Sequence, residues 1–188
     1  LRGRNWVLSN VVGNWLIGGM YTYESPQYAT VQSSLDSNLN IDTAGDRAVV
    51  NPAGREGVGS DVTALTNSAG QTVGYLADDP DARYIRAGLG VFPNAGRNTL
   101  PMAPINNWDL NLTKRFAIGE TKAFEIRGYF FNVLNHAQYT PGYVNKVLFK
   151  SSNATRNHLV PGHEWFNDPS RVFDSNSRAV QLVARFTF

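Results

Sequence analysis

The chain has 188 residues, of which 42% are hydrophobic and 17% are charged, and this composition favours a folded protein over a disordered one. The formal net charge is +2 and the Lys and Arg residues are scattered, so a nucleic-acid partner is not expected. Cys is absent, which excludes a disulfide framework and thiolate chemistry. No run of about 18 apolar residues occurs, so a membrane-spanning part would have to consist of strands.

The first clear element is a strand at about 14–24. The residues before it, 1–12, are mixed in character and predict at most a turn or a partial strand. From 14 onward apolar side chains alternate with a period of two, which is typical of a strand with two different faces. One face carries aromatic residues near both ends: Trp15, Tyr21 and Tyr23. This placement predicts the two interfacial girdles of a membrane β-barrel, with a strand of a soluble β-protein as the alternative.

A long polar segment follows at 25–105. It is rich in Gly, Asn, Asp, Ser and Pro, and we expect a loop with few strands or helices. Short helices are predicted at 61–67 and 79–87, where an Asp could cap each N-terminus. A loop of this length is unusual in a compact soluble domain but normal on the extracellular side of a barrel.

Two further alternating stretches, 107–116 and 123–133, predict an antiparallel hairpin with a tight turn that contains Gly119. Their apolar faces also carry aromatic residues: Trp108, Phe124 and Phe130. We expect the aromatic side chains of all these strands to face lipid or a neighbouring subunit. Lys114 interrupts the apolar face near one end, where its long side chain could reach the membrane interface.

The chain ends with a second long loop at 135–177 and a fourth strand at 178–188. This last strand again alternates, with Val180, Leu182, Ala184, Phe186 and Phe188 on one side. The sequence therefore predicts an all-β fold: about four antiparallel strands of an outer-membrane β-barrel, connected by long ordered loops.

Several motifs resemble the C-terminal end of TonB-dependent outer-membrane receptors. They are GRN followed by NNWDLNLTKRF, the strand end FFNVLNH, and the terminal aromatic residue after an alternating strand. The resemblance covers most of the chain and is to the Oar-like, acidobacterial type, which has an N-terminal carboxypeptidase-regulatory-like domain. It implies that 1–188 is a C-terminal barrel segment in the bacterial outer membrane that does not transport alone.

The resemblance also implies partners. They are the remainder of the receptor barrel and its plug, outer-membrane lipid, the barrel-assembly machinery, and TonB through an N-terminal part. In that family the last strand is the signal for the assembly machinery, and the matching residues are Leu182, Ala184, Phe186 and Phe188. The signal peptide, TonB box, plug and most of the family's about 22 strands do not occur in the sequence, so we expect a piece of a longer protein.

Four strands alone leave a second interpretation open. They cannot close a barrel, and each open edge presents unpaired N–H and C=O groups. Either the rest of a barrel covers these edges, or identical copies do so. In the second case the chain would be a released fragment that assembles into an extracellular filament, soluble without detergent.

One loop has the spacing of a calcium site. Oxygen-bearing side chains alternate at Asp36, Asn38, Asn40 and Asp42, with Asp46 as a further ligand. Such a D-x-N-x-N-x-D pattern can wrap Ca²⁺. The EF-hand pattern fails, however, because its sixth position is Ile41 and its twelfth is Arg47. Asx-rich turns are therefore the main interpretation and calcium the alternative, and no other cofactor is expected.

Enzyme motifs do not occur in the sequence. GxSxG, HExxH and GxxxxGK[ST] are all missing, so neither a nucleophile elbow, a zinc protease motif nor a P-loop is present. His158, His163 and Glu164 lack the close spacing of zinc ligands. We therefore expect no catalytic residues.

Overall fold

The computed structural model describes residues 6–41, 46–139 and 158–188, which divide into two compact units. The first unit is formed by the described residues of 1–24, 105–138 and 176–188, and the second by those of 25–104 and 139–175. The predicted loops therefore form a unit of their own.

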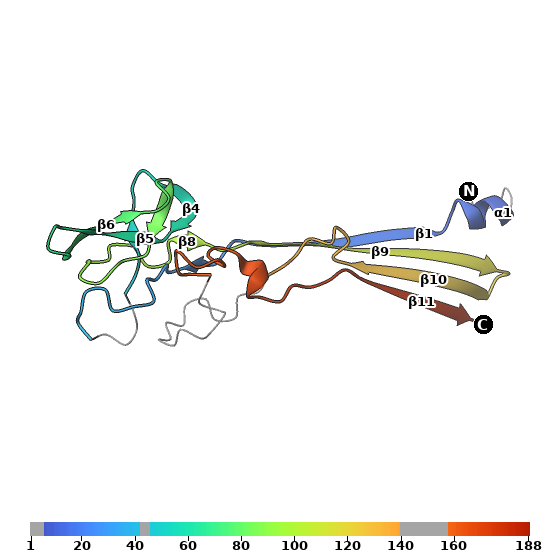
Figure 1. The fold of residues 1–188 in the computed structure, drawn as a ribbon. Coiled ribbons are helices and arrows are strands. Elements are labelled where there is room, and N and C mark those ends of the chain that lie inside the picture. The colour runs from blue at the N-terminus through green and yellow to red at the C-terminus, as the bar shows by residue number, and fades with distance from the viewer. Residues whose placement is uncertain (1–5, 42–45, 140–157) are drawn as a thin grey trace. The chain divides into compact units, whose positions relative to one another are not determined.

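A four-stranded antiparallel sheet makes up the first unit (Figure 1). Its strands, in sheet order, are β1 (Trp15–Glu24), β9 (Ile105–Ile118), β10 (Lys122–Phe131) and β11 (Ala179–Thr187). In the part of the chain that the structure describes, β1 and β11 each pair on one side only, so the sheet has two open edges.

The register places the four apolar faces on the same side of the sheet. Ile17 pairs with Leu112, Leu112 with Gly128, and Gly128 with Leu182. Directly opposed residues of neighbouring strands point to the same face, so this row is free of polar side chains across all four strands. A slip of one residue in β9 or β10 would bring Asn111, Thr113, Arg127 or Tyr129 into the row, so the alternation of the two central strands specifies the register.

One end of the sheet carries a short turn, and the other carries the long connections. β9 and β10 are joined through Gly119, whose φ of +72° suits a residue without a Cβ. The end of β11 lies beside this turn (Figure 1). At the opposite end the chain leaves β1 and β10 and returns into β9 and β11.

Helix α1 (Trp6–Val11) precedes β1 at the short-turn end (Figure 1). The prediction of a turn or partial strand was wrong here, because this stretch has no period-2 alternation and Val7 and Val11 are one helical turn apart. The side chain of Asn10 ties the helix to β9: its Oδ1 accepts from Ala117 N at 2.9 Å, and its Nδ2 donates to Ala117 O at 3.3 Å.

The second unit contains several small sheets, so the prediction of few strands in 25–105 was wrong. Its strands are β2 (Tyr28–Ala29), β3 (Val49–Val50), β4 (Arg55–Ser60), β5 (Val62–Thr66), β6 (Thr72–Ala77), β7 (Ala82–Ile85) and β8 (Leu100–Pro101). They pair as β2–β8, β3–β7–β4 and β5–β6, and a 3-10 turn, η1, spans Pro169–Arg171. A small core of buried residues, including Val31, Tyr84, Leu100 and Leu159, holds them together.

Both predicted short helices were also wrong, because 61–67 contains β5 and 79–87 contains β7. β5 reads VTALT, and its β-branched residues favour a strand. The two Asp residues expected to cap helices act locally instead. Asp61 Oδ1 accepts from Val62 N at 3.0 Å, and Asp79 Oδ1 accepts from Asp81 N at 2.8 Å.

The two long segments fold together within the second unit. Gln32 N donates to Leu159 O at 3.0 Å, and the side chain of Leu159 lies in the core. The ring of Phe166 lies so close to Gly59 that a Cβ there would be 2.5 Å from it, and it meets Tyr84 edge-on at 6.4 Å. Neither segment is therefore an independent loop.

Candidate functional site

The apolar face of the sheet is uncovered in its centre. Ile17 is 74% exposed and Leu182 is 73% exposed, although both lie in the row that is apolar in every strand. Water-soluble monomers rarely leave a contiguous apolar patch of this kind open. This face therefore needs a partner, either lipid or protein.

Aromatic side chains border this face at both ends. Near the short-turn end lie Trp15, Phe116, Phe124 and Phe186, and towards the opposite end lie Tyr21, Tyr23, Trp108 and Phe130. The rings of Tyr21 and Trp108 are 4.5 Å apart, and those of Phe116 and Phe124 are 6.3 Å apart. From Trp108 to Phe116 the strand rises about 27 Å at ~3.4 Å per residue, close to the ~25 Å apolar band of an outer-membrane barrel.

The opposite face of the sheet is mainly polar, although β1 contributes Leu16 and Met20 to it. Glu125 is flanked in register by Arg115 of β9 and Arg185 of β11, and its carboxylate accepts from Arg127 Nε. Asp109 Oδ1 accepts from Asn132 N at 2.8 Å near the other end of the sheet. A sheet with one apolar and one charged face is what a barrel with a wet interior requires.

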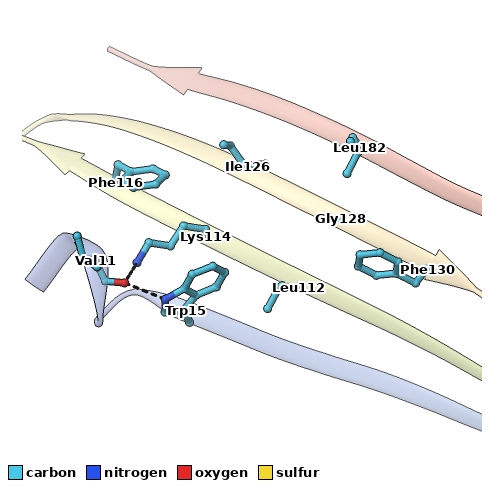
Figure 2. Close-up of a pocket in the computed structure, with 9 residues that line it drawn as sticks. All are labelled: Val11, Trp15, Leu112, Lys114, Phe116, Ile126, Gly128, Phe130 and Leu182. Atoms are coloured by element: carbon cyan, nitrogen blue, oxygen red, sulfur yellow. Dashed lines mark hydrogen bonds between the residues drawn. The ribbon is translucent and has the colours of Figure 1, made fainter. Parts of the chain in front are cut away.

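A groove is hollowed into the apolar face near α1 (Figure 2). It has a volume of about 440 Å³ and is lined by Val11, Trp15, Leu112, Lys114, Phe116, Ile126, Gly128, Phe130 and Leu182. Gly128 leaves room in its floor, where a Cβ would lie 3.1 Å from the ring of Phe130. The groove was not foreseen from the sequence, because α1 was not predicted and helix and sheet form it together.

Lys114 lies at one side of this groove and is almost fully buried, with 6% of its surface exposed. Its Nζ donates to the carbonyls of Gly13 and Val11, the latter at 3.1 Å. Val11 O also accepts from Trp15 Nε1 at 3.1 Å, as Figure 2 shows. The Lys114 side chain does not extend into water, because the carbonyls at the end of α1 need donors and the ammonium reaches them. The expectation that it reaches the level of the membrane interface stays a prediction.

Aromatic rings complete the surroundings of the ammonium. Lys114 Nζ is 4.6 Å from the ring centroid of Trp15 and 5.4 Å from that of Phe116. A cation over aromatic faces at these distances is attracted to them, more strongly where water is excluded. Lys114 thus joins α1, β1 and β9.

Side-chain oxygens in the predicted calcium loop are used as turn acceptors. Asp36 accepts from the backbone N–H groups of Asn40, at 3.1 Å, and Ile41, at 2.7 Å. Asp46 accepts from Ser37 Oγ and Asn38 N, each at 2.8 Å. No group of three or more His, Asp or Glu residues gathers within the described ranges, and Asp42 lies outside them. Calcium binding stays a prediction.

The residues expected to form an assembly signal lie on β11 or directly after it. Leu182, Ala184 and Phe186 share the apolar face, and the ring of Phe188 is 6.2 Å from that of Phe186. Their geometry is that of any lipid-type strand, and their role in assembly stays a prediction.

Comparisons with known proteins place the chain in one family. A family model described as an outer membrane beta barrel domain matches residues 1–158, which include β1, β9 and β10. No curated protein and no solved structure matches the chain. Among the residues that the structure describes, no helix is long and apolar enough to cross a membrane.

Proposed function

From the premise that the chain belongs to the outer membrane beta barrel domain family, we propose that its sheet is part of the wall of a TonB-dependent receptor. The observation that supports this most directly is the register. Apolar faces from four separate strands meet on one side, with aromatic residues near both ends and charged residues on the other side. That arrangement suits lipid outside and water inside.

The connections give the orientation of the sheet in this proposal. Short turns of such barrels face the periplasm and long loops face the outside. The turn at Gly119, helix α1 and the end of β11 would therefore be periplasmic, and the second unit would be extracellular. Because this unit has its own core, it would present a folded surface to a solute.

The assignment to TonB-dependent receptors rests on the sequence motifs at the strands of the hairpin and on the two long segments. The open edges of β1 and β11 would pair with further strands of the same barrel, since unpaired backbone groups are costly in lipid. The plug would lie against the charged face. TonB would supply the energy for uptake through the N-terminal part of the protein.

Cysteine labelling tests the orientation of the faces, and residues 1–188 contribute no background thiol to it. The protein to test is the full-length receptor to which this proposal assigns the chain, called the parent protein below. In it, Val180→Cys on the apolar face should react with a membrane-soluble maleimide but not with a water-soluble one. Gln181→Cys, its neighbour on the polar face, should show the reverse preference. Equal labelling of the two positions by both reagents would contradict a lipid-facing side.

A second experiment tests the TonB assignment separately. The intact parent protein should co-purify with the periplasmic domain of TonB in detergent. A protein that inserts with the labelling pattern above but never binds TonB would be a barrel of another kind. Long fibres in detergent-free buffer under the electron microscope would instead support the filament interpretation and overturn the membrane proposal.

A further inference from the structure

We propose that the groove beside α1 binds an anionic phospholipid of the periplasmic leaflet, with an acyl chain in the groove and the headgroup phosphate next to Lys114. The proposal rests on the membrane-spanning role given above, and it adds a specific ligand to a face that otherwise meets bulk lipid.

The first support is a buried cation that forms no ion pair with an acidic side chain of the described residues. Ion pairs within the described ranges join Arg55 to Asp81, Arg127 to Glu125 and Arg171 to Asp168, and none involves Lys114. Two of the three N–H donors of its ammonium are used by backbone carbonyls. These acceptors and the rings of Trp15 and Phe116 are neutral, so they compensate the cost of burying the charge only in part, and an anion beside it would be stabilised.

The second support is the composition of the groove. Apart from Lys114, every residue that lines it is apolar or aromatic, from Val11 on the helix to Leu182 on the last strand. Its volume of about 440 Å³ falls within the roughly 300–1,000 Å³ typical of small-ligand sites. A ligand that matches one cation at the side of an apolar slot is an anionic amphiphile. Because Lys114 lines the groove, an anion that enters there comes next to its side chain.

The third support is depth. Lys114 pairs with Trp15 on β1 and with Ile126 on β10, one row inside the aromatic row of Phe116 and Phe124. Trp residues prefer the level of the lipid headgroups, and Lys residues near that level attract anionic lipids. The short-turn end faces the periplasm in the proposed orientation, so the lipid available there is the phospholipid of the inner leaflet.

Native mass spectrometry of the intact parent protein tests the proposal. The protein is purified in detergent and mixed with equal amounts of phosphatidylglycerol and phosphatidylethanolamine. We expect one bound phosphatidylglycerol, preferred about fivefold over phosphatidylethanolamine, which is the effect of one Lys near a lipid surface. Absence of any preference in the native protein would overturn the proposal.

Two variants and a matched control separate the charge from the groove. Lys114→Gln replaces the ammonium by a neutral amide that can still donate hydrogen bonds. This variant should bind both lipids equally. Leu182→Phe fills the groove and should lose the bound lipid. Val180→Phe introduces the same ring one row further along the same face, at a residue that does not line the groove, and should retain the lipid.

Lipid binding and barrel formation are read out separately. Each variant is also run on a gel before and after heating, because a folded barrel changes its mobility when heat unfolds it. Equal lipid retention by Leu182→Phe and Val180→Phe, with both barrels folded, would refute the groove as the site. If the native protein itself migrated identically before and after heating, it would form no folded barrel, and this would contradict the membrane-spanning role itself.

Discussion

Ile17→Arg and Leu16→Arg form the most direct test of the two faces of the sheet. The two residues are neighbours in β1, and both are exposed in the structure, at 74% and 65%. If the sheet were surrounded by water, both changes should be close to neutral, as surface substitutions usually are. If the apolar face meets lipid, only Ile17→Arg should be harmful.

The magnitude follows from the depth of Ile17. It pairs with Leu112, which lies halfway between Trp108 and Phe116 on β9, so it is near the middle of the apolar band. An Arg on the lipid face near the midplane costs roughly 2–4 kcal/mol, whereas a lumen-facing change does not carry this penalty. At about 1.4 kcal/mol per factor of ten, the ratio of folded to unfolded protein should fall by roughly one and a half to three orders of magnitude.

The assay is denaturant unfolding of the parent protein from lipid vesicles, with folding followed by gel mobility before and after heating. Ile17→Arg should shift the midpoint to a clearly lower denaturant concentration, and Leu16→Arg should stay near the native value. Equal midpoints for the two variants would refute the assignment of the faces. A larger effect for Leu16→Arg would mean that the sheet faces the other way.

Three further changes test the turn, the strand ends and the second unit. Gly119→Ala should lower the free energy of unfolding by about 1–2 kcal/mol in the same titration, because its φ of +72° strains a residue with a Cβ, and an unchanged midpoint would contradict this. Asn132→Ala removes a buried side chain whose Nδ2 donates to His136 O, just after β10, and to Asn176 O, in the segment before β11; it should lower the free energy of unfolding by roughly 1–3 kcal/mol in the same titration. Gly59→Val must displace the ring of Phe166, so limited proteolysis on intact cells should cut 158–175 faster; an unchanged rate would mean that the two segments do not depend on each other.

The four strands of the sheet could be predicted because each carries its own signal. The stretch at 14–24 alternates by itself, and the structure has β1 over Trp15–Glu24. The same holds for β11, predicted at 178–188 and observed over Ala179–Thr187. Alternation is a local property, and once every strand has one apolar face, a common apolar side for the sheet fixes the register.

The second unit could not be predicted because its strands depend on distant partners. β2 has only two residues, and Tyr28 pairs with Pro101 far along the chain. A strand this short has no room for a visible alternation. Its core likewise brings Val31 next to residues of the last third of the chain, such as Leu159. In the sequence, residues 25–105 show only turn-forming residues and short polar runs, and this composition predicts a loop.

The predicted calcium loop illustrates a second limit of sequence reasoning. Alternating Asp and Asn residues offer oxygens at the spacing of a cation site, but backbone N–H groups compete for the same oxygens. In the structure Asp36 receives two such groups, from residues at the end of its own loop. Leu39 and Ile41 then adopt φ values of +61° and +66°, which side chains rarely favour, so the loop depends on those hydrogen bonds.

Lys114 shows that an exception to a pattern can be more informative than the pattern. A face that met only lipid tails would gain nothing from a Lys, because burying its charge is costly. The carbonyls of Val11 and Gly13 compensate part of that cost, and they are available only because α1 ends there. Without α1, the ammonium would lose these acceptors. Without Lys114, the carbonyl of Gly13 would lose this donor and that of Val11 would keep Trp15 Nε1. Lys114 therefore stabilises the contact between α1 and this end of the sheet, beside which the groove lies.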